Sequence, residues 1–418
     1  MLIKTILNRI QKFKSFVYTH VELIQEKQGD PILLVHVRPR VGSRPICSRC
    51  GRLGPGYDTL NPRRFEFVPL WGIPVFFVYA MRRVECPRCG IVVELVPWAR
   101  GKSHLTKSYA WFLARWARRM SWKEVAEAFQ TSWENVFRSV KMAVAWGLAH
   151  RDLEGITAIG VDEIQWHKGQ NYLTLVYQID EGCKRLLWIG KERTEKTFHA
   201  FFDLIGEDRC NAIRFVCSDM WKSYLNVIAE RAKNALTILD RYHIMAKMNK
   251  AIDKVRATEV KKLAAEGYEP VLRKSRWLLL KRPENLTESQ EIKLADLLRY
   301  NLKSVRSYLL KEDFQSFWEY KMPFWAGRFL DQWCTRVMRS RIEPMKDIAK
   351  TLREHRGLIL NWFKAKNVLS LGAVEGLNNK AKVTTRKSYG FRTFGAAEIA
   401  LYHTLGNFRA PDMMATTC

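Results

Sequence analysis

The sequence predicts a multidomain α+β protein, and three observations carry this prediction. The chain has 418 residues, which is too long for a single hydrophobic core of ordinary size, so two to four domains are expected. Two Cys-x-x-Cys pairs lie within its first hundred residues. A helical pattern follows from about residue 103, and after about residue 155 strand-like runs alternate with helical ones.

The composition is that of a folded protein without membrane spans. Hydrophobic residues make up 47% of the chain and aromatic residues 12%, which argues against disorder. No apolar run approaches the roughly 18 residues that a spanning helix needs, and the longest candidate is broken by Gly72 and Pro74. The first residues lack the pattern of a secretion signal. The sequence therefore predicts a cytoplasmic protein.

The charge balance points to a polyanionic partner. The chain carries 70 Lys and Arg against 42 Asp and Glu, a formal net charge of +28. Such an excess favours phosphate neutralisation with release of counterions, so nucleic acid is the expected partner. An anionic membrane surface is the alternative, weakened because no amphipathic anchor is evident.

The two cysteine pairs predict a zinc-binding β module over residues 1–100. Each pair can offer two thiolates from one turn, and two such turns close a tetrahedral site around one structural Zn²⁺. Gly51 and Gly90 directly follow the pairs, where a permissive backbone is needed, and residues 65–85 read as a β-hairpin that brings the pairs together. Chance pairing of reduced thiols is the alternative. The expected ligands are Cys47, Cys50, Cys86 and Cys89.

Residues 101–150 predict a helix-turn-helix domain that binds DNA. Ser121 and Glu124 fit a capping box, and Thr131 or Ser132 can cap the helix that follows. The short spacing matches a DNA-reading motif, in which Arg138 and Lys141 would face a groove or phosphates. Plain helical packing explains the same pattern.

Residues 151–255 predict the first part of a catalytic core. Three strand-like runs, AIGVDEI, YLTLVYQID and RLLWIG, are followed by helix, strand, helix, strand and helix. This is the order of the ribonuclease H-like α/β fold, with a mixed sheet. The catalytic centre of that fold needs carboxylates on the first and fourth strands and on a later helix.

Three acids stand at those places. Asp162 lies at the expected end of the first strand, Asp219 ends the fourth, and Glu375 lies on a later helix. Oxygen-rich sites of this kind suit Mg²⁺ or Mn²⁺, and two such ions can serve a phosphodiester displacement. Taken alone, an Asp that closes a strand is more often a turn or cap residue, and a Glu on a basic helix is usually a surface ion-pair partner. Glu163 is the rival of Asp162, and alternation along a strand lets only one of them serve.

The helix of Glu375 also carries groups suited to DNA. Asn379 and Lys382 follow at one and two turns and share its face. The expected DNA contacts of this segment are Asn379, Lys382, Arg386 and Lys387.

The order of these motifs resembles the ISL-three (ISL3) insertion-sequence transposases from about Cys47 to about Gly406. The segments that carry the resemblance are the two cysteine pairs, GVDEIQWHKGQNYLTLVYQID, SDMWKSY, LDRYHIMAKMNKAIDKVR and VEGLNNKAKVTTRKSYGFRTF. The resemblance implies a DDE transposase whose triad falls on Asp162, Asp219 and Glu375. It also implies an all-helical insertion over residues 256–365, the final helices of the core over 366–409 and a tail over 410–418.

Two details of the resemblance leave alternatives open. The family's Asp-x-x-His after the fifth strand matches Asp240 and His243, for which an accessory site role competes with capping and packing. Leu371 stands where many relatives carry Asn, which leaves the contacts at that helix entry open.

The expected function is that of a DNA transposase. It would bind terminal inverted repeats, hydrolyse a phosphodiester bond and join the freed 3′-hydroxyl to target DNA, as a homodimer or higher oligomer on double-stranded DNA. A prokaryotic, nucleoid-associated location follows. The alternatives are a non-catalytic zinc and helix-turn-helix regulator derived from such an enzyme, and a structure-specific nuclease on the same fold.

Overall fold

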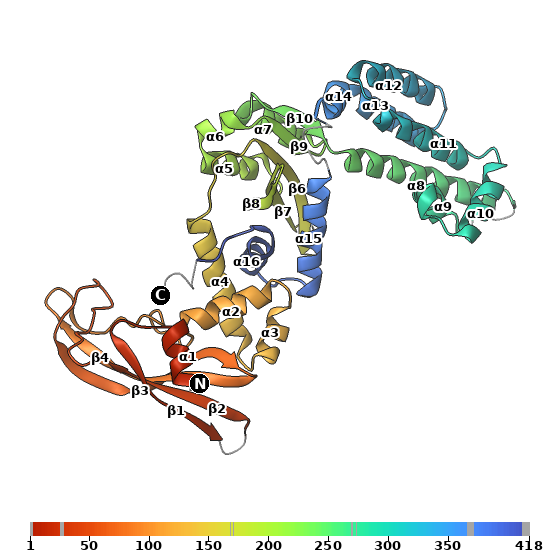
Figure 1. The fold of residues 1–418 in the computed structure, drawn as a ribbon. Helices are drawn as coiled ribbons and strands as arrows, with labels where there is room; N and C mark the ends of the chain where they lie inside the picture. Colours follow the sequence, from red (N-terminus) through yellow and green to blue (C-terminus); the bar gives the residue numbers. More distant parts are fainter. Residues whose placement is uncertain are drawn as a thin grey trace. The chain divides into compact units, whose positions relative to one another are not determined.

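The chain folds into two compact units in the computed structural model (Figure 1), which describes residues 3–25, 29–167, 169, 171–268, 271–272, 274–365 and 372–411. One unit comprises Met1–Asp152 with Val383–Cys418, and the other comprises Leu153–Lys382. Each contains one five-stranded mixed sheet, so the α+β class is confirmed. Leu371 and the tail beyond residue 411 lie outside the described residues.

The first unit is built on a sheet with the strand order β1-β2-β4-β3, and β5 pairs with β4. Strands β2 and β4 are parallel, and the other pairs are antiparallel. Buried Trp98 packs against Phe16 and Tyr79 at ring distances of 4.9 and 5.2 Å, which fixes the core under the sheet. The elements are α1 (Ile3–Ile10), β1 (Phe16–Gln25), β2 (Pro31–Pro39), β3 (Gly56–Leu70), β4 (Ile73–Cys86) and β5 (Gly90–Val93).

Four helices complete this unit, and their caps confirm the predicted helix starts. Ser121 and Glu124 form the expected capping box, and Ser132 accepts a hydrogen bond from the backbone of Asn135. The helix α4 packs against α2, α3 and α16. The unit boundary thus falls within the segment 366–409 that sequence analysis grouped with the core. The helices are α2 (Lys107–Ala117), α3 (Trp122–Ala128), α4 (Trp133–Ala149) and α16 (Phe394–Leu405).

The second unit contains a sheet with the order β10-β9-β6-β7-β8. The strands β6, β7 and β8 form an antiparallel meander, whereas β9 is parallel to β6 and β10 is parallel to β9. The expected succession of strands and helices is observed. The elements are β6 (Ala158–His167), β7 (Asn171–Asp180), β8 (Cys183–Lys191), α5 (Glu195–Ile205), α6 (Glu207–Ala212), β9 (Phe215–Ser218), α7 (Lys222–Arg231) and β10 (Leu236–Leu239).

The two faces of this sheet are covered differently. Ile159 and Val161 pack with the aromatic side chains of α5 and α7 on one face. Gly160 points to the other face, where α15 (Ala373–Lys387) lies along the sheet (Figure 1). A Cβ atom on Gly160 would come within 2.3 Å of Val374 Cγ2, so the absent side chain is what lets α15 approach β6.

A helical region lies between the last strand and α15. Its core is rich in aromatic residues, including buried Phe314, Phe317 and Trp333. The expected turn at Pro283 and Asn285 is a single 3₁₀ turn. None of the described helices has both the length and the apolar character needed to cross a membrane. The helices are α8 (Arg241–Ala265), α9 (Arg276–Leu280), α10 (Glu288–Leu298), α11 (Lys303–Gln315), α12 (Pro323–Met338), α13 (Glu343–Glu354) and α14 (Arg356–Ala365).

Candidate functional site

The four predicted cysteine ligands meet at one point of the first unit. Cys47 and Cys50 lie between β2 and β3, Cys86 ends β4, and Cys89 lies in the turn before β5. Their Sγ atoms all lie within 4.8 Å of one another, and those of Cys50 and Cys86 are 3.5 Å apart. Zinc–sulfur bonds of about 2.3 Å in a tetrahedron require sulfurs about 3.8 Å apart. The β3–β4 hairpin therefore assembles a thiolate set that fits one zinc ion.

Backbone geometry and electrostatics support this reading of the cysteines. Gly51 and Gly90 adopt φ values of +73° and +71°, a region that other residues rarely enter. The backbone N–H of Cys50 lowers the pKa of the Cys47 thiol to about 6. Desolvation and the neighbouring thiols raise the pKa of Cys89 to about 12. The set thus forms one thiolate easily and resists full ionisation unless a cation is bound.

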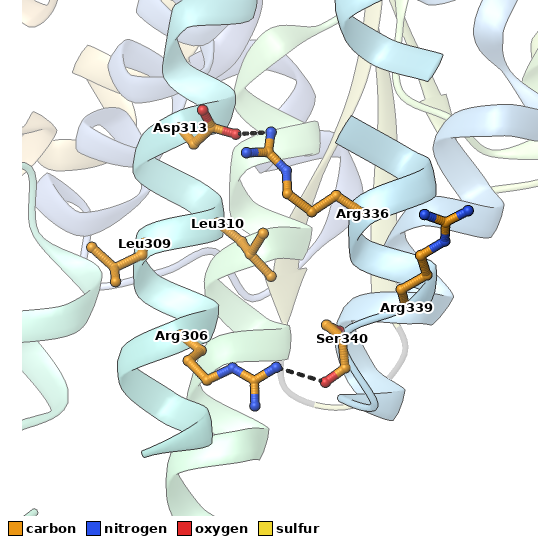
Figure 2. Close-up of a pocket in the computed structure, with 7 residues that line it drawn as sticks. All are labelled: Arg306, Leu309, Leu310, Asp313, Arg336, Arg339 and Ser340. Atoms are coloured by element: carbon orange, nitrogen blue, oxygen red, sulfur yellow. Dashed lines mark hydrogen bonds and ion pairs between the residues drawn. The ribbon is translucent and has the colours of Figure 1, made fainter. Parts of the chain in front are cut away.

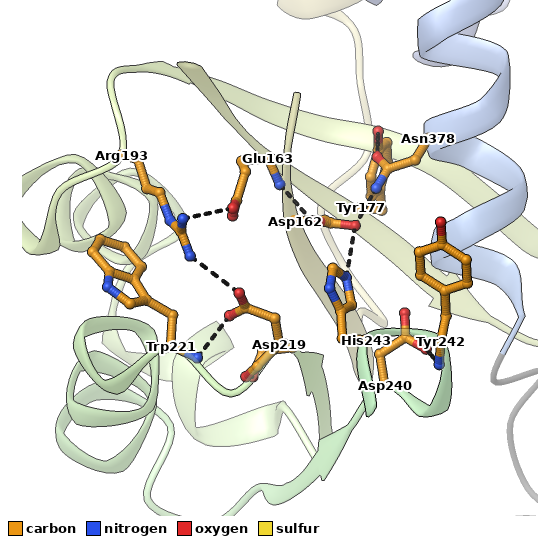
Figure 3. A network of polar contacts seen from close by, with 11 residues as sticks. Asp162, Glu163, Tyr177, Arg193, Asp219, Trp221, Asp240, Tyr242, His243 and Asn378 are labelled. Atoms are coloured by element: carbon orange, nitrogen blue, oxygen red, sulfur yellow. Dashed lines mark hydrogen bonds and ion pairs between the residues drawn. The ribbon is translucent and has the colours of Figure 1, made fainter. Parts of the chain in front are cut away.

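Asp162 lies inside strand β6, in a buried polar network (Figure 3). The sequence analysis placed it at the end of the strand, but β6 continues to His167 because the pairing with β7 extends past Asp162. Its Oδ1 accepts a hydrogen bond from the backbone of Glu163, at 2.7 Å. Its Oδ2 accepts from the amide of Asn378 and lies 3.5 Å from His243 Nε2. Asp162 therefore faces α15 and the start of α8.

Asn378 is a site residue that sequence reasoning missed. Its Oδ1 accepts a hydrogen bond of 2.7 Å from the hydroxyl of buried Tyr177 on β7. This contact turns the amide so that its NH₂ group points to Asp162. The available signal was its position three residues after Glu375, which places it on the same side of α15.

Asp219 follows β9 directly. The parallel strands β6 and β9 pair Gly160 with Cys217, and each acid follows two residues after this pair. Asp219 Oδ1 accepts from the backbone N–H of Trp221 at 3.0 Å, and Oδ2 accepts from Arg193 at 3.1 Å.

Glu163 points to the face opposite Asp162, as strand alternation predicts. Its Oε1 lies 2.9 Å from Arg193, while its buried Oε2 has no hydrogen-bond partner among the described residues. Burial and then the charge of Asp219 raise the pKa of Glu163 to about 7, against the opposing effect of Arg193. Arg193 thus stands between two acids, a role that nothing in its local sequence announced.

Glu375 lies exposed in the first turn of α15, one turn before Asn378. The pKa of Asp240 is raised to about 6, first by burial and in addition by the charges of Asp162 and Glu375. Glu375 therefore interacts electrostatically with Asp240. In the described part of the chain, only the four cysteines gather three or more potential metal-binding atoms within 4.8 Å. Asp162, Asp219 and Glu375 thus belong to one acidic region without being drawn to that distance.

Asp240 and His243 both lie at this region. Asp240 caps α8 by accepting from the backbone of Tyr242 at 2.8 Å, so its capping role is real. Burial lowers the pKa of His243, but the hydrogen bond and charge of Asp162 outweigh it and raise the value to about 9. In the metal-free protein Asp162 thus favours the charged form of His243.

The residues expected to contact DNA are mostly exposed. Arg138 and Lys141 are exposed on α4, and Asn379, Lys382 and Arg386 are exposed on α15. Lys387 is half-buried, and burial lowers its pKa against the opposing charge of Glu124.

The helical region holds a separate pocket of about 480 Å³ between α11 and α12 (Figure 2). Arg306 donates to the carbonyl of Ser340 at 3.0 Å, and Arg336 pairs with Asp313 at 2.5 Å. Arg339 adds a third guanidinium to the lining. The pocket is thus basic, in contrast to the acidic region on the sheet.

Comparison with known proteins places this architecture in one family. Residues 159–400 match the family model of the ISL3 transposases. The chain is 28% identical over 350 residues to the transposase for insertion sequence element IS1001 of Bordetella parapertussis, over 83% of this chain and 85% of that protein. It is 30% identical over 407 residues to the transposase for insertion sequence element IS1557 of Mycobacterium tuberculosis (strain CDC 1551 / Oshkosh), over 91% of this chain and 90% of that protein. The chain therefore belongs to the ISL3 family of insertion-sequence transposases.

Proposed function

We propose that this chain is a DDE transposase that binds the terminal inverted repeats of its element, cleaves phosphodiester bonds there and joins the 3′-hydroxyl ends to target DNA. The observation that carries the proposal is the placement of three acids in the second unit. Asp162 lies on β6, Asp219 directly follows the adjacent parallel strand β9, and α15, which carries Glu375, packs over the same sheet. The strand order, in which the meander is followed by two parallel strands beside its first strand, supports a ribonuclease H-like core.

Asp162, Asp219 and Glu375 are the proposed ligands of Mg²⁺ or Mn²⁺. The acidic region fits such ions because it gathers carboxylates where their charge is disfavoured: burial first, and neighbouring acids in addition, raise the pKa of Glu163 and of Asp240. Hard divalent cations prefer oxygen ligands of this kind. Bound there, two ions would supply Lewis acidity for the attacking and leaving oxygens of a phosphodiester displacement.

The surrounding residues are proposed to hold these ligands in place. Asn378 donates to Asp162 and fixes its orientation, and Tyr177 fixes Asn378. His243 offers a positive charge next to Asp162, which supports the accessory role proposed for the Asp240 and His243 pair. Ligand orientation by such partners affects metal sites strongly.

DNA recognition is proposed for the first unit. The cysteine set would hold one structural zinc ion, and α3 and α4 would act as a helix-turn-helix with Arg138 and Lys141 on the DNA side. The net charge of +28 favours the phosphate backbone of double-stranded DNA. Because two element ends must be joined in concert, a homodimer or higher assembly on DNA is part of the proposal.

A cleavage assay on DNA that carries the element ends, with Mg²⁺, tests the proposal. Asp219→Ala should abolish cleavage and leave end binding unchanged in a mobility-shift assay. Asp203→Ala, which removes a surface partner of Arg231, is the matched control and should cleave like the wild type. Normal cleavage by Asp219→Ala would refute the catalytic assignment. Binding without cleavage by the wild-type protein would favour the non-catalytic regulator instead.

A further inference from the structure

Arg193 bridges two acids at the edge of the proposed metal site. One guanidinium nitrogen lies 2.9 Å from Glu163 Oε1 and another lies 3.1 Å from Asp219 Oδ2. The guanidinium also stacks over the ring of Trp221, 4.2 Å from its centroid. All three charged side chains are largely buried, with 29%, 16% and 14% of Arg193, Glu163 and Asp219 exposed.

The backbone aims Arg193 at this position. The preceding residue, Glu192, has a φ of 75°, which a residue other than glycine rarely adopts. Its N–H donates to the carbonyl of Tyr172 at 2.9 Å, and its own carbonyl accepts from Thr174 at 2.8 Å. Thr194, the next residue, caps α5. The residues on both sides of Arg193 are thus fixed, Glu192 in an unfavourable backbone conformation and Thr194 as a helix cap. Unfavourable backbone conformations of this kind are common at functional sites.

Only one oxygen of Asp219 contacts a charged side chain. Its Oδ1 accepts from the backbone N–H of Trp221, whereas Oδ2 accepts from Arg193, so a metal ion that binds Oδ2 would compete with Arg193. Glu163 Oε2 and Arg193 Nε are both buried and without hydrogen-bond partners in the described residues. A guanidinium that left Asp219 could therefore pair with both oxygens of Glu163, which would satisfy these two atoms.

We infer that Arg193 is a positioning residue that occupies Asp219 Oδ2 in the metal-free protein and yields this oxygen to a divalent cation by shifting onto Glu163. The inference rests on the proposed role of Asp219 as a metal ligand. It assigns Glu163 as the partner that retains Arg193, and not as a ligand of the metal. In the metal-free protein the charge of Arg193 offsets those of Glu163 and Asp219, which reduces the repulsion between these two carboxylates.

The test is a titration of the full-length, zinc-loaded protein with Mn²⁺ by isothermal calorimetry in the absence of DNA. Arg193→Gln removes the competing cation, so the dissociation constant for Mn²⁺ should fall by about two- to fivefold. Without Mn²⁺ this variant should melt at a lower temperature than the wild type, and saturating Mn²⁺ should narrow the difference. Arg231→Gln is the matched control, because Arg231 likewise pairs with an acid, Asp203, at 2.7 Å and lies 5.9 Å over a ring, Phe202. It should leave Mn²⁺ binding unchanged.

An unchanged or higher dissociation constant in Arg193→Gln would overturn the inference, since a merely structural ion pair predicts that result. If this variant does not fold, Arg193→Lys decides, because lysine keeps the charge but lacks the fork that pairs with two carboxylates. Tighter Mn²⁺ binding by Arg193→Lys supports the inference, and unchanged or weaker binding overturns it.

Asp219→Asn separates the two proposals: if it still binds Mn²⁺ and cleaves DNA, the proposed function fails whatever the Arg193 variants show. If it loses both while Arg193→Gln binds Mn²⁺ like the wild type, only the role of Arg193 fails.

Discussion

The side-chain amide of Asn378 donates a hydrogen bond to Oδ2 of Asp162 and so joins α15 to β6 across 216 positions of the chain. Because Glu375 lies one turn before Asn378, this bond also fixes how far along β6 the third proposed acid stands. Two acids that are remote in sequence are thereby held in one register.

Replacement of Asn378 should therefore weaken metal binding, although Asn378 is not itself a proposed metal ligand. In Asn378→Ala, Asp162 loses a donor and buried Tyr177 loses its acceptor, so metal affinity or cleavage should fall by about 10- to 100-fold. Tyr177→Phe keeps the donor to Asp162 and should show a smaller loss. Mn²⁺ titration and end cleavage measure both, with Lys380→Ala, exposed on the same helix, as the control. Equal values for Asn378→Ala and Lys380→Ala would contradict the assignment.

A methyl group on Gly160 should push α15 off the sheet. In Gly160→Ala the new Cβ atom meets Val374 Cγ2 at 2.3 Å, and overpacking of this kind costs about 1–3 kcal/mol. We expect a lower melting temperature and a loss of cleavage, since Glu375 follows Val374 directly. The double variant Gly160→Ala with Val374→Ala removes the clash and should recover both properties. If the double variant recovers neither property, the clash with Val374 is not the cause of the defect in Gly160→Ala.

Loss of one cysteine ligand should unfold the zinc module. Wild-type protein should contain one zinc ion per chain by atomic absorption, and Cys86→Ser should contain little or none, because structural zinc sites depend on a complete ligand set. Specific end binding should be lost with it. Cys183→Ser, outside the cluster, should retain zinc and binding. Full zinc content in Cys86→Ser would refute the site.

The buried His403 should make the first unit sensitive to mild acid. Burial, aided by the charge of Arg118, lowers the pKa of His403 to about 3, against about 6.5 in the unfolded chain. The unfolded state therefore takes up the proton first, and stability is lost as the pH falls from 6.5 towards 3, by at most about 1.4 kcal/mol per pH unit. His403→Leu should show a flatter decline of melting temperature between pH 6.5 and 4.5. Parallel curves for the two proteins would argue against this linkage.

Arg138 should contribute to DNA affinity through phosphate. Arg138→Ala should weaken end binding and reduce the slope of log K against log salt by about 1. Lys141→Ala should act in the same way. Lys184→Ala, which removes an equal charge from an exposed position of β8, should change neither quantity. If all three variants behave alike, the effect is one of net charge and not of α4.

Local patterns in the sequence predict much of this fold. The capping box at Ser121, the hairpin that brings the cysteine pairs together, and the strands that hold Asp162 and Asp219 each follow from residues close in sequence. The alternation that separates Asp162 from Glu163 follows from strand geometry alone.

Contacts between distant segments are what the sequence leaves open. A helical period of 3.6 does not decide which side of this helix turns towards the sheet. The packing of Val374 over Gly160 decides it, so that Asn378 is buried while Asn379 is exposed. The contacts of Arg193 cannot be predicted for a similar reason, since its partners Glu163 and Asp219 lie 30 and 26 positions away in the chain.

Helix α8 runs for 25 residues without a break, a rod of about 38 Å. Near its root, His243 rests against Asp162, and further along Met248, Ile252 and Val255 are buried in the hydrophobic core shared with α9 to α14. Glu259 then clamps the rod to the start of α11 by accepting from the backbone of Ser304 at 2.8 Å. One uninterrupted helix thus carries both the contacts of the helical region and His243, so a rotation of α8 would move this imidazole relative to Asp162.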